Sequence, residues 1–117
     1  MYKSSIELMR HIERESSFII NSTKEYTFES FYSDEILKRA VVRALEIIGE
    51  ASKKTDNEFK LSHSQIAWIN MAGLRNRLIH DYEGTDYAIV WEAIQDDIPE
   101  LHFQVTEILK NNTDDTL

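Results

Sequence analysis

The residues able to do chemistry are concentrated between Gly73 and Tyr82, where arginine, amide, histidine and tyrosine side chains alternate with apolar ones. Arg75 is permanently charged and presents a planar fork of N–H donors that suits phosphate oxygens. A histidine such as His80 ordinarily titrates near about 6.5 and can move a proton at neutral pH. Together they could cleave a phosphodiester through a neighbouring 2′-hydroxyl, because His80 would move the proton while Arg75 stabilises the charge on phosphorus. This chemistry needs no metal ion.

The spacing of Arg75 and His80 restricts how the two can meet. Each residue of an α-helix turns the chain by about 100°, so side chains five positions apart point about 140° away from each other. Either the helix ends or distorts near His80, as Gly84 would permit, or two copies of the motif form the site across a dimer axis. Asn76 lies four residues before His80, on the same helical face, and could orient the imidazole.

Composition restricts the class of protein. The 117 residues, 42% of them hydrophobic, predict one domain over 1–110 and a polar tail over 111–117. Cysteine is absent, which excludes disulfides and thiolate zinc sites, and neither a signal-peptide core nor a membrane-spanning run is present. We therefore expect a cytoplasmic protein without a membrane partner, a metal or another cofactor.

The net charge of −8 argues against broad electrostatic capture of nucleic acid. Binding of RNA would therefore depend on a local basic patch, which only the fold could assemble. The candidate cations for this patch are Lys38, Arg39, Arg43, Lys53, Lys54, Arg75 and Arg77.

Apolar residues recur at helical spacing in four segments. The first helix should begin at Ser4, which forms a capping-box pattern with Glu7, and the second should begin within 28–33 and reach Ser52. Gly49 would cost about 1 kcal/mol inside that helix, so we expect a neighbouring helix to approach it closely. The inward positions of these two helices are Ile6, Met9, Ile12, Ile19, Ile20, Leu37, Val41, Ala44, Leu45, Ile48 and Ser52.

The third and fourth helices flank the motif. The third should follow a polar loop over 55–61 and begin with a second capping box at Ser62. The fourth is capped by Thr85 or Asp86, and Pro99, which lacks a backbone N–H, should kink or break it. The inward positions are Ile66, Ile69, Met71, Leu74, Leu78, Val90, Ile94, Leu101, Val105 and Ile108, with Trp68 and Trp91 as further packing residues.

Each motif residue also has a purely structural explanation. Arg75 could bridge to an acidic side chain, His80 could be favoured at a helix C-terminus by the dipole, and Tyr82 could be half-buried. Glu46 and Glu50 lie one turn apart but have no ligand spacing around them, so we interpret them as exposed or capping charges. The sequence places no convergent partner near His11 or His102, and His63 is expected to be solvated at a helix start, so none of the three is assigned to a site.

Three blocks of the sequence resemble HepT toxins of the HEPN ribonuclease superfamily. Residues 75–80 resemble the R-x4-H motif, with Asn76 as the polar residue that commonly follows the arginine, and Tyr82 extends the match to the R-x4-H-x-Y form. Blocks at 47–51 and 85–91 match in order and separation, which is far more specific than the short motif alone. The resemblance covers nearly the whole chain.

This resemblance implies an all-α fold, an antiparallel four-helix up-down bundle, and a homodimeric endoribonuclease toxin of a type VII-like system. It implies that Arg75 and His80 are catalytic, that Asn76 orients and that Arg77 holds the RNA backbone. It also implies a partner, a minimal nucleotidyltransferase antitoxin that AMPylates Tyr82. The RNA substrate, transfer RNA or messenger RNA, is left open.

A second hypothesis belongs to another class of protein. Related small helical proteins serve as partner or substrate-binding subunits of nucleotidyltransferases. In a non-catalytic subunit of this kind, Arg75 and His80 would grip a nucleotide or the partner enzyme. The acidic net charge fits such a module somewhat better than a nuclease.

Overall fold

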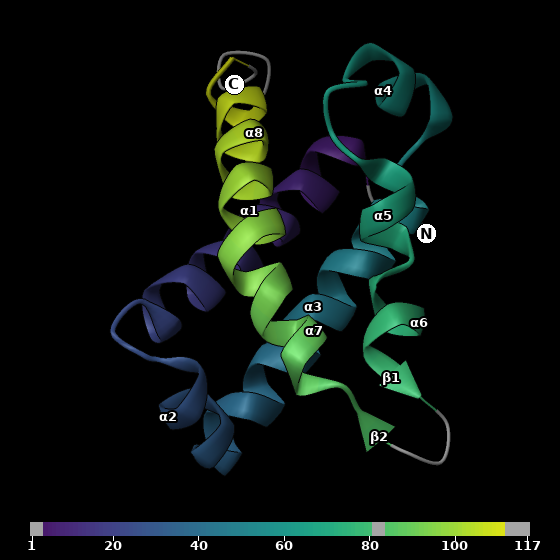
Figure 1. The fold of residues 1–117 in the computed structure, drawn as a ribbon. Coiled ribbons are helices and arrows are strands. Elements are labelled where there is room, and N and C mark those ends of the chain that lie inside the picture. Colours follow the sequence, from purple (N-terminus) through teal and green to yellow (C-terminus); the bar gives the residue numbers. More distant parts are fainter. Residues whose placement is uncertain (1–3, 81–83, 112–117) are drawn as a thin grey trace.

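The computed structural model describes residues 4–80 and 84–111, with Ile79 and His80 described by their backbone alone. Within these ranges the secondary structure is a set of helices and one short β-pair, which confirms the predicted all-α class (Figure 1). The helices are α1 (Ser5–Thr23), α2 (Phe28–Ser33), α3 (Glu35–Lys54), α4 (Asn57–Ser62), α5 (Trp68–Ala72), α6 (Leu74–Leu78), α7 (Tyr87–Glu92), the π-helix η1 (Ala93–Asp97) and α8 (Ile98–Asn111). The strands are β1 (Ile79–His80) and β2 (Gly84–Thr85).

Three long helices, α1, α3 and α8, form the centre of the bundle. Helix α1 packs against both α3 and α8, and α5 and α6 lie along α3 (Figure 1). The Oγ atom of Ser4 accepts the N–H of Glu7 at 3.2 Å and so caps α1 as predicted. The side chains with no exposed surface include Met9, Ile12, Ile19, Val41, Leu45, Ile48, Leu74, Leu78, Val90 and Val105, all of them predicted inward positions.

The second predicted helix is divided into α2 and α3 at Asp34. The carboxylate of Asp34 accepts the backbone N–H of Leu37 and the hydroxyl of Tyr26, both at 3.0 Å. The hydrogen bond from Leu37 and then that from Tyr26 lower the pKa of Asp34, and the carboxylate in turn raises the pKa of Tyr26. This cap gives α3 its own N-terminus, so the long helix begins at Glu35 rather than within 28–33.

Aromatic contacts attach α2 to the bundle. The Phe31 side chain is fully buried, and its ring centre lies 5.3 Å from that of Trp91 and 6.3 Å from that of Tyr87. The ammonium nitrogen of Lys38 lies 4.2 Å and 4.5 Å from the ring centres of Tyr32 and Tyr87, a cation–π arrangement. Trp91 is therefore a packing residue, as predicted, and α2, α3 and α7 are joined at this point.

The prediction of the third helix was wrong in several details. Residues 57–62, expected to be mostly loop, form α4, and Ser62 is its last residue rather than an N-cap. Helix α5 starts only at Trp68, and Gly73 separates it from α6. Ile69, expected in the core, has 89% of its surface exposed.

Local aromatic packing explains why this helix does not start at Ser62. The Phe59 ring stacks on His63 with centres 4.3 Å apart and meets Trp68 edge-on at 6.3 Å. The indole N–H of Trp68 donates to the backbone carbonyl of His63 at 3.0 Å. These contacts fold the chain between α4 and α5 into a turn, which removes residues 63–67 from any helix.

Gly49 confirms the predicted close approach. A Cβ atom at this position would lie 3.1 Å from the backbone oxygen of Met71 and 3.9 Å from the Cβ of Leu74. The absence of a side chain therefore lets the α5–α6 segment contact α3 directly.

Replacing Gly49 with valine should lower the free energy of unfolding by about 1–3 kcal/mol, because the added atoms meet a backbone carbonyl that cannot rotate away. Urea unfolding would measure the change. Valine is a better helix former than glycine, so without a steric clash the substitution should leave the free energy of unfolding unchanged or raise it. An unchanged or raised free energy of unfolding would therefore show that the approach at Gly49 is not tight.

The fourth predicted helix is divided before Pro99, as expected. Asp86 caps α7 by accepting the N–H of Ile89 at 3.2 Å, and the π-helix η1 then separates α7 from α8. A proline ring clashes with the carbonyl of the preceding α-helical turn, and the wider π turn lies where that clash would fall. Within the described ranges, no helix is both long and apolar enough to cross a bilayer.

Candidate functional site

Helix α6 carries the first half of the motif. Leu74 and Leu78, four residues apart, are fully buried and hold the helix on the bundle. Arg75, Asn76 and Arg77 lie between them and are all exposed. The helix thus presents its three polar motif residues outward.

Helix α6 ends at Leu78, two residues before His80, which is the first of the two predicted alternatives. The chain enters β1 and returns through β2, with His80 opposite Gly84 and Ile79 opposite Thr85. Gly84 has a φ of +79°, a conformation that glycine adopts without strain. Because His80 is in a strand, the helical relation expected between it and Asn76 does not apply.

The His80 side chain and the whole of Tyr82 lie outside the described residues. Their predicted roles in proton transfer and in modification therefore remain predictions. What the structure does describe is the backbone that carries His80 and the full environment of Arg75.

Arg75 forms an ion pair with a residue of another helix. Its Nε atom lies 3.4 Å from Oε2 of Glu46 on α3, and 64% of the Arg75 side chain is exposed. The other oxygen of Glu46 lies 3.9 Å from Nη1 of Arg43. The structural alternative for Arg75 is thus observed, and the interpretation of Glu46 as a simple exposed charge was wrong. Glu50, one turn further along α3, is exposed as expected.

Arg77 forms a second ion pair on the opposite side of α6. Its Nη2 atom lies 3.4 Å from Oδ2 of Asp97, the last residue of η1. Helix α6 is therefore held to α3 through Arg75 and to η1 through Arg77.

The predicted basic patch forms only in part. Lys38 is excluded, because it is buried with its nitrogen 3.1 Å from Oε2 of Glu35. Arg43 and Arg75 do converge, since both lie within 4 Å of Glu46, and Arg77 is on the same short helix as Arg75. Arg43 and Arg75 thus share one carboxylate on one side of α6, while Arg77 pairs with Asp97 on the other side.

Two histidines have partners that sequence reasoning missed. Nδ1 of His102 on α8 lies 3.0 Å from Oγ of Ser16, a fully buried residue of α1. His63 stacks on Phe59 and is half-buried. The contact of His102 with Ser16 joins α8 to α1, whereas the stack of His63 on Phe59 lies at the C-terminal end of α4. In the part of the chain that the structure describes, no three histidine, aspartate or glutamate side chains gather as a metal site would require.

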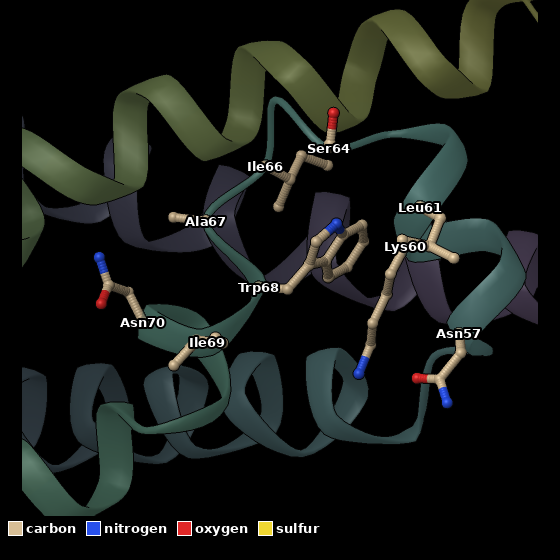
Figure 2. Close-up of a pocket in the computed structure, with 9 residues that line it drawn as sticks. All are labelled: Asn57, Lys60, Leu61, Ser64, Ile66, Ala67, Trp68, Ile69 and Asn70. Atoms are coloured by element: carbon tan, nitrogen blue, oxygen red, sulfur yellow. The ribbon is translucent and has the colours of Figure 1, made fainter.

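A hollow of about 660 Å³ lies between α4 and α5, away from the motif (Figure 2). Trp68 lies at its centre, with Leu61 and Ile69 at its border. The lining is mostly apolar and contains no residue of the motif, so we do not assign the candidate chemistry to this hollow.

The fold and the motif define a class of protein, a HEPN-like helical bundle whose R-x4-H pattern runs from a short helix into the first strand of a short β-pair. The family of ribonuclease HepT-like proteins matches residues 8–108, and the chain belongs to this family. It is thereby placed among the ribonucleases, as the sequence predicted.

Named relatives agree with this placement. A candidate RNase of Caldanaerobacter subterraneus subsp. tengcongensis is 49% identical over 87% of this chain and 91% of its own length. A candidate ribonuclease HepT of Thermococcus cleftensis is 40% identical over 94% of this chain and all of its own length. A candidate RNase of Methanocaldococcus jannaschii is 40% identical over 74% of this chain and 80% of its own length. No solved structure matches the chain significantly.

Proposed function

We propose that the chain is a metal-independent endoribonuclease that acts as the toxin of a type VII-like toxin–antitoxin pair. The observation that carries this proposal is the end of α6 at Leu78. An unbroken helix would hold Arg75 and His80 on different faces, whereas the entry into β1 removes that constraint within one chain.

The reaction needs one proton-transfer group and one cation. The 2′-hydroxyl of the RNA loses its proton and attacks the adjacent phosphorus, and the bond to the 5′-oxygen breaks as that oxygen gains a proton. His80 moves the proton at one of these steps, and Arg75 stabilises the charge on the crowded phosphate. Asn76 orients the reacting groups, and Arg77 holds the RNA backbone. The products are a 2′,3′-cyclic phosphate and a 5′-hydroxyl.

Regulation and assembly complete the proposal. The chain forms a homodimer, and exposed apolar residues such as Ile36, Leu61 and Ile69, each more than three-quarters exposed, are available for such contacts.

A nucleotidyltransferase antitoxin adds an adenylyl group to Tyr82. The added phosphate brings negative charge and bulk two residues from His80, which repels and displaces the substrate phosphate.

The test uses the chain alone. Its induction should arrest growth and fragment cellular RNA, and the purified chain should leave cyclic phosphate ends in the presence of a metal chelator. RNA with a 2′-deoxy nucleotide at the cleaved position should resist, because the attacking hydroxyl is absent. Cleavage of the deoxy substrate at the same position would overturn the proposed mechanism. Tyr82→Phe should keep cleavage but escape the antitoxin.

The net charge of −8 favours one second candidate, the non-catalytic subunit of a nucleotidyltransferase, because an acidic chain fits a protein-binding module better than a nuclease. In such a subunit Arg75 would bind a nucleotide or the partner enzyme. On this alternative, a soluble and folded chain would leave growth and RNA untouched, and it would raise the affinity of a nucleotidyltransferase for its substrate.

A further inference from the structure

We infer that Glu46 is a positioning residue for Arg75, an inference that rests on the proposed ribonuclease activity. Glu46 comes from the middle of α3, a helix that contains no residue of the R-x4-H motif. Its carboxylate is 23% exposed, and one of its oxygens lies 3.4 Å from Nε of Arg75. The contact therefore links the candidate catalytic arginine to α3, a helix of 20 residues that also packs against α1 and α5.

The atom that Glu46 contacts decides what Arg75 can still bind. A guanidinium group has one N–H on Nε and four more on its two terminal nitrogens, and the terminal pair forms the fork that grips a phosphate. A carboxylate at Nε occupies the inner edge of the group. Because the contact with Glu46 is at Nε and 64% of the Arg75 side chain is exposed, the terminal nitrogens can be directed to an RNA phosphate.

The close approach at Gly49 explains why Glu46 can reach α6. Gly49 follows Glu46 by one turn of α3, and the backbone of Met71 lies against it. This contact brings the start of α6 next to the turn that carries Glu46. Helix α6 has only five residues, and so short a helix has few backbone hydrogen bonds to stabilise it. A contact such as that with Glu46 can therefore fix the direction of the Arg75 side chain.

The charge of the cluster supports orientation rather than neutralisation. Glu46 alone would cancel the positive charge of Arg75, which would weaken binding of a phosphate. Arg43 lies 3.9 Å from the other carboxylate oxygen of Glu46 and is 65% exposed. Two arginines and one carboxylate leave one net positive charge, so Glu46 can orient Arg75 while the surface remains attractive to RNA.

The test compares Glu46→Gln with Glu50→Gln. Misplacing Arg75 should lower kcat by about tenfold to a hundredfold and leave KM within about threefold, because the fork acts on the transition state. Glu50 lies one turn away, is exposed and makes no ion pair with any described residue, so Glu50→Gln should leave both constants unchanged. An unchanged kcat in Glu46→Gln, or a fall in KM alone, would overturn the inference.

A double-variant cycle distinguishes positioning from a general loss of structure. Lysine carries a single ammonium group, so it cannot contact Glu46 through one N–H while it binds a phosphate through two others. In an Arg75→Lys background, Glu46→Gln should therefore cause no further fall in kcat. A further tenfold fall there would show that Glu46 acts elsewhere. An NMR signal from the Arg75 Nε–H group should also shift in Glu46→Gln but not in Glu50→Gln.

The two possible failures are distinguishable. If the unmodified chain cleaves no RNA, the proposed function falls and the positioning role falls with it. If the unmodified chain cleaves RNA and Glu46→Gln cleaves equally fast, the inference about Glu46 alone is wrong.

Discussion

Arg75→Ala should lower the rate of RNA cleavage by about 10²–10³-fold, the usual cost of removing one donor that stabilises a developing oxyanion. Arg75 is the second residue of α6 and 64% of its side chain is exposed, so the variant should stay folded. Single-turnover cleavage at saturating RNA measures the chemical step, and circular dichroism with thermal unfolding checks the fold.

Arg77→Ala is the matched control. Arg77 lies on the same helix, is also exposed and also forms one ion pair of 3.4 Å. Arg77 is proposed to contact the RNA backbone, so Arg77→Ala should weaken RNA binding with little change in the cleavage rate at saturating RNA. The slope of log affinity against log salt concentration should become shallower by about 1. Equal losses of the saturated rate in both variants would show that the integrity of α6, and not the charge of Arg75, limits cleavage.

His80→Ala should cost at least as much as Arg75→Ala, because proton transfer by a side chain contributes about 10²–10⁴-fold. A folded His80→Ala protein with unchanged cleavage would exclude the proposed mechanism.

Phe31→Ala should destabilise the protein by about 3–5 kcal/mol, the range found for deleting a buried aromatic ring. Phe31 is fully buried and joins α2 to Tyr87 and Trp91 on α7. A loss of this size is a large part of the about 5–15 kcal/mol that usually stabilises a domain. Urea unfolding followed by circular dichroism would measure it.

Phe103→Ala is the control for Phe31. Its side chain is 66% exposed on α8, so the same change should stay within about 0.5 kcal/mol. A loss at Phe103 as large as that at Phe31 would mean that an unseen contact covers the surface of α8. A small loss at Phe31 would mean that α2 contributes little to the folded state.

The long helices could be predicted from the sequence because their apolar residues repeat over many turns. In α3, the apolar positions at helical spacing from Val41 to Ile48 are all buried. This apolar face packs against several other helices, so its periodicity was enough to predict a long central helix. Ser4 was identified as a cap, and Asp86 as one of two candidate caps, because a cap depends on the residues next to it.

The segment from α4 to α6 was harder to predict because contacts between side chains determine where its helices begin and end. A pattern that includes Ile69 and Leu74 has helical spacing, but the stack of Phe59 on His63 and the turn at Gly73 interrupt it. The sequence gives no periodic signal for a contact between two aromatic residues in a turn.

The sequence indicated candidate site residues, whose roles stay predictions, but it did not indicate the partners of these residues. Arg75 was identified from its type and spacing, whereas its contact with Glu46 depends on how α6 lies on α3. The available signal was Gly49, which indicated a close approach one turn after Glu46. Local patterns therefore indicated where two helices meet, while the pairing across them required the fold.

A five-residue helix opens more easily than the bundle on which it lies. Isolated helices need about 12–15 residues to persist in water, so α6 depends on Leu74, Leu78 and two exposed ion pairs that salt screens. Its backbone amides should exchange with solvent through local opening, at a lower free energy than global unfolding. A molecule that binds α6 in its opened form would therefore remove Arg75 from the site while the rest of the protein stays folded.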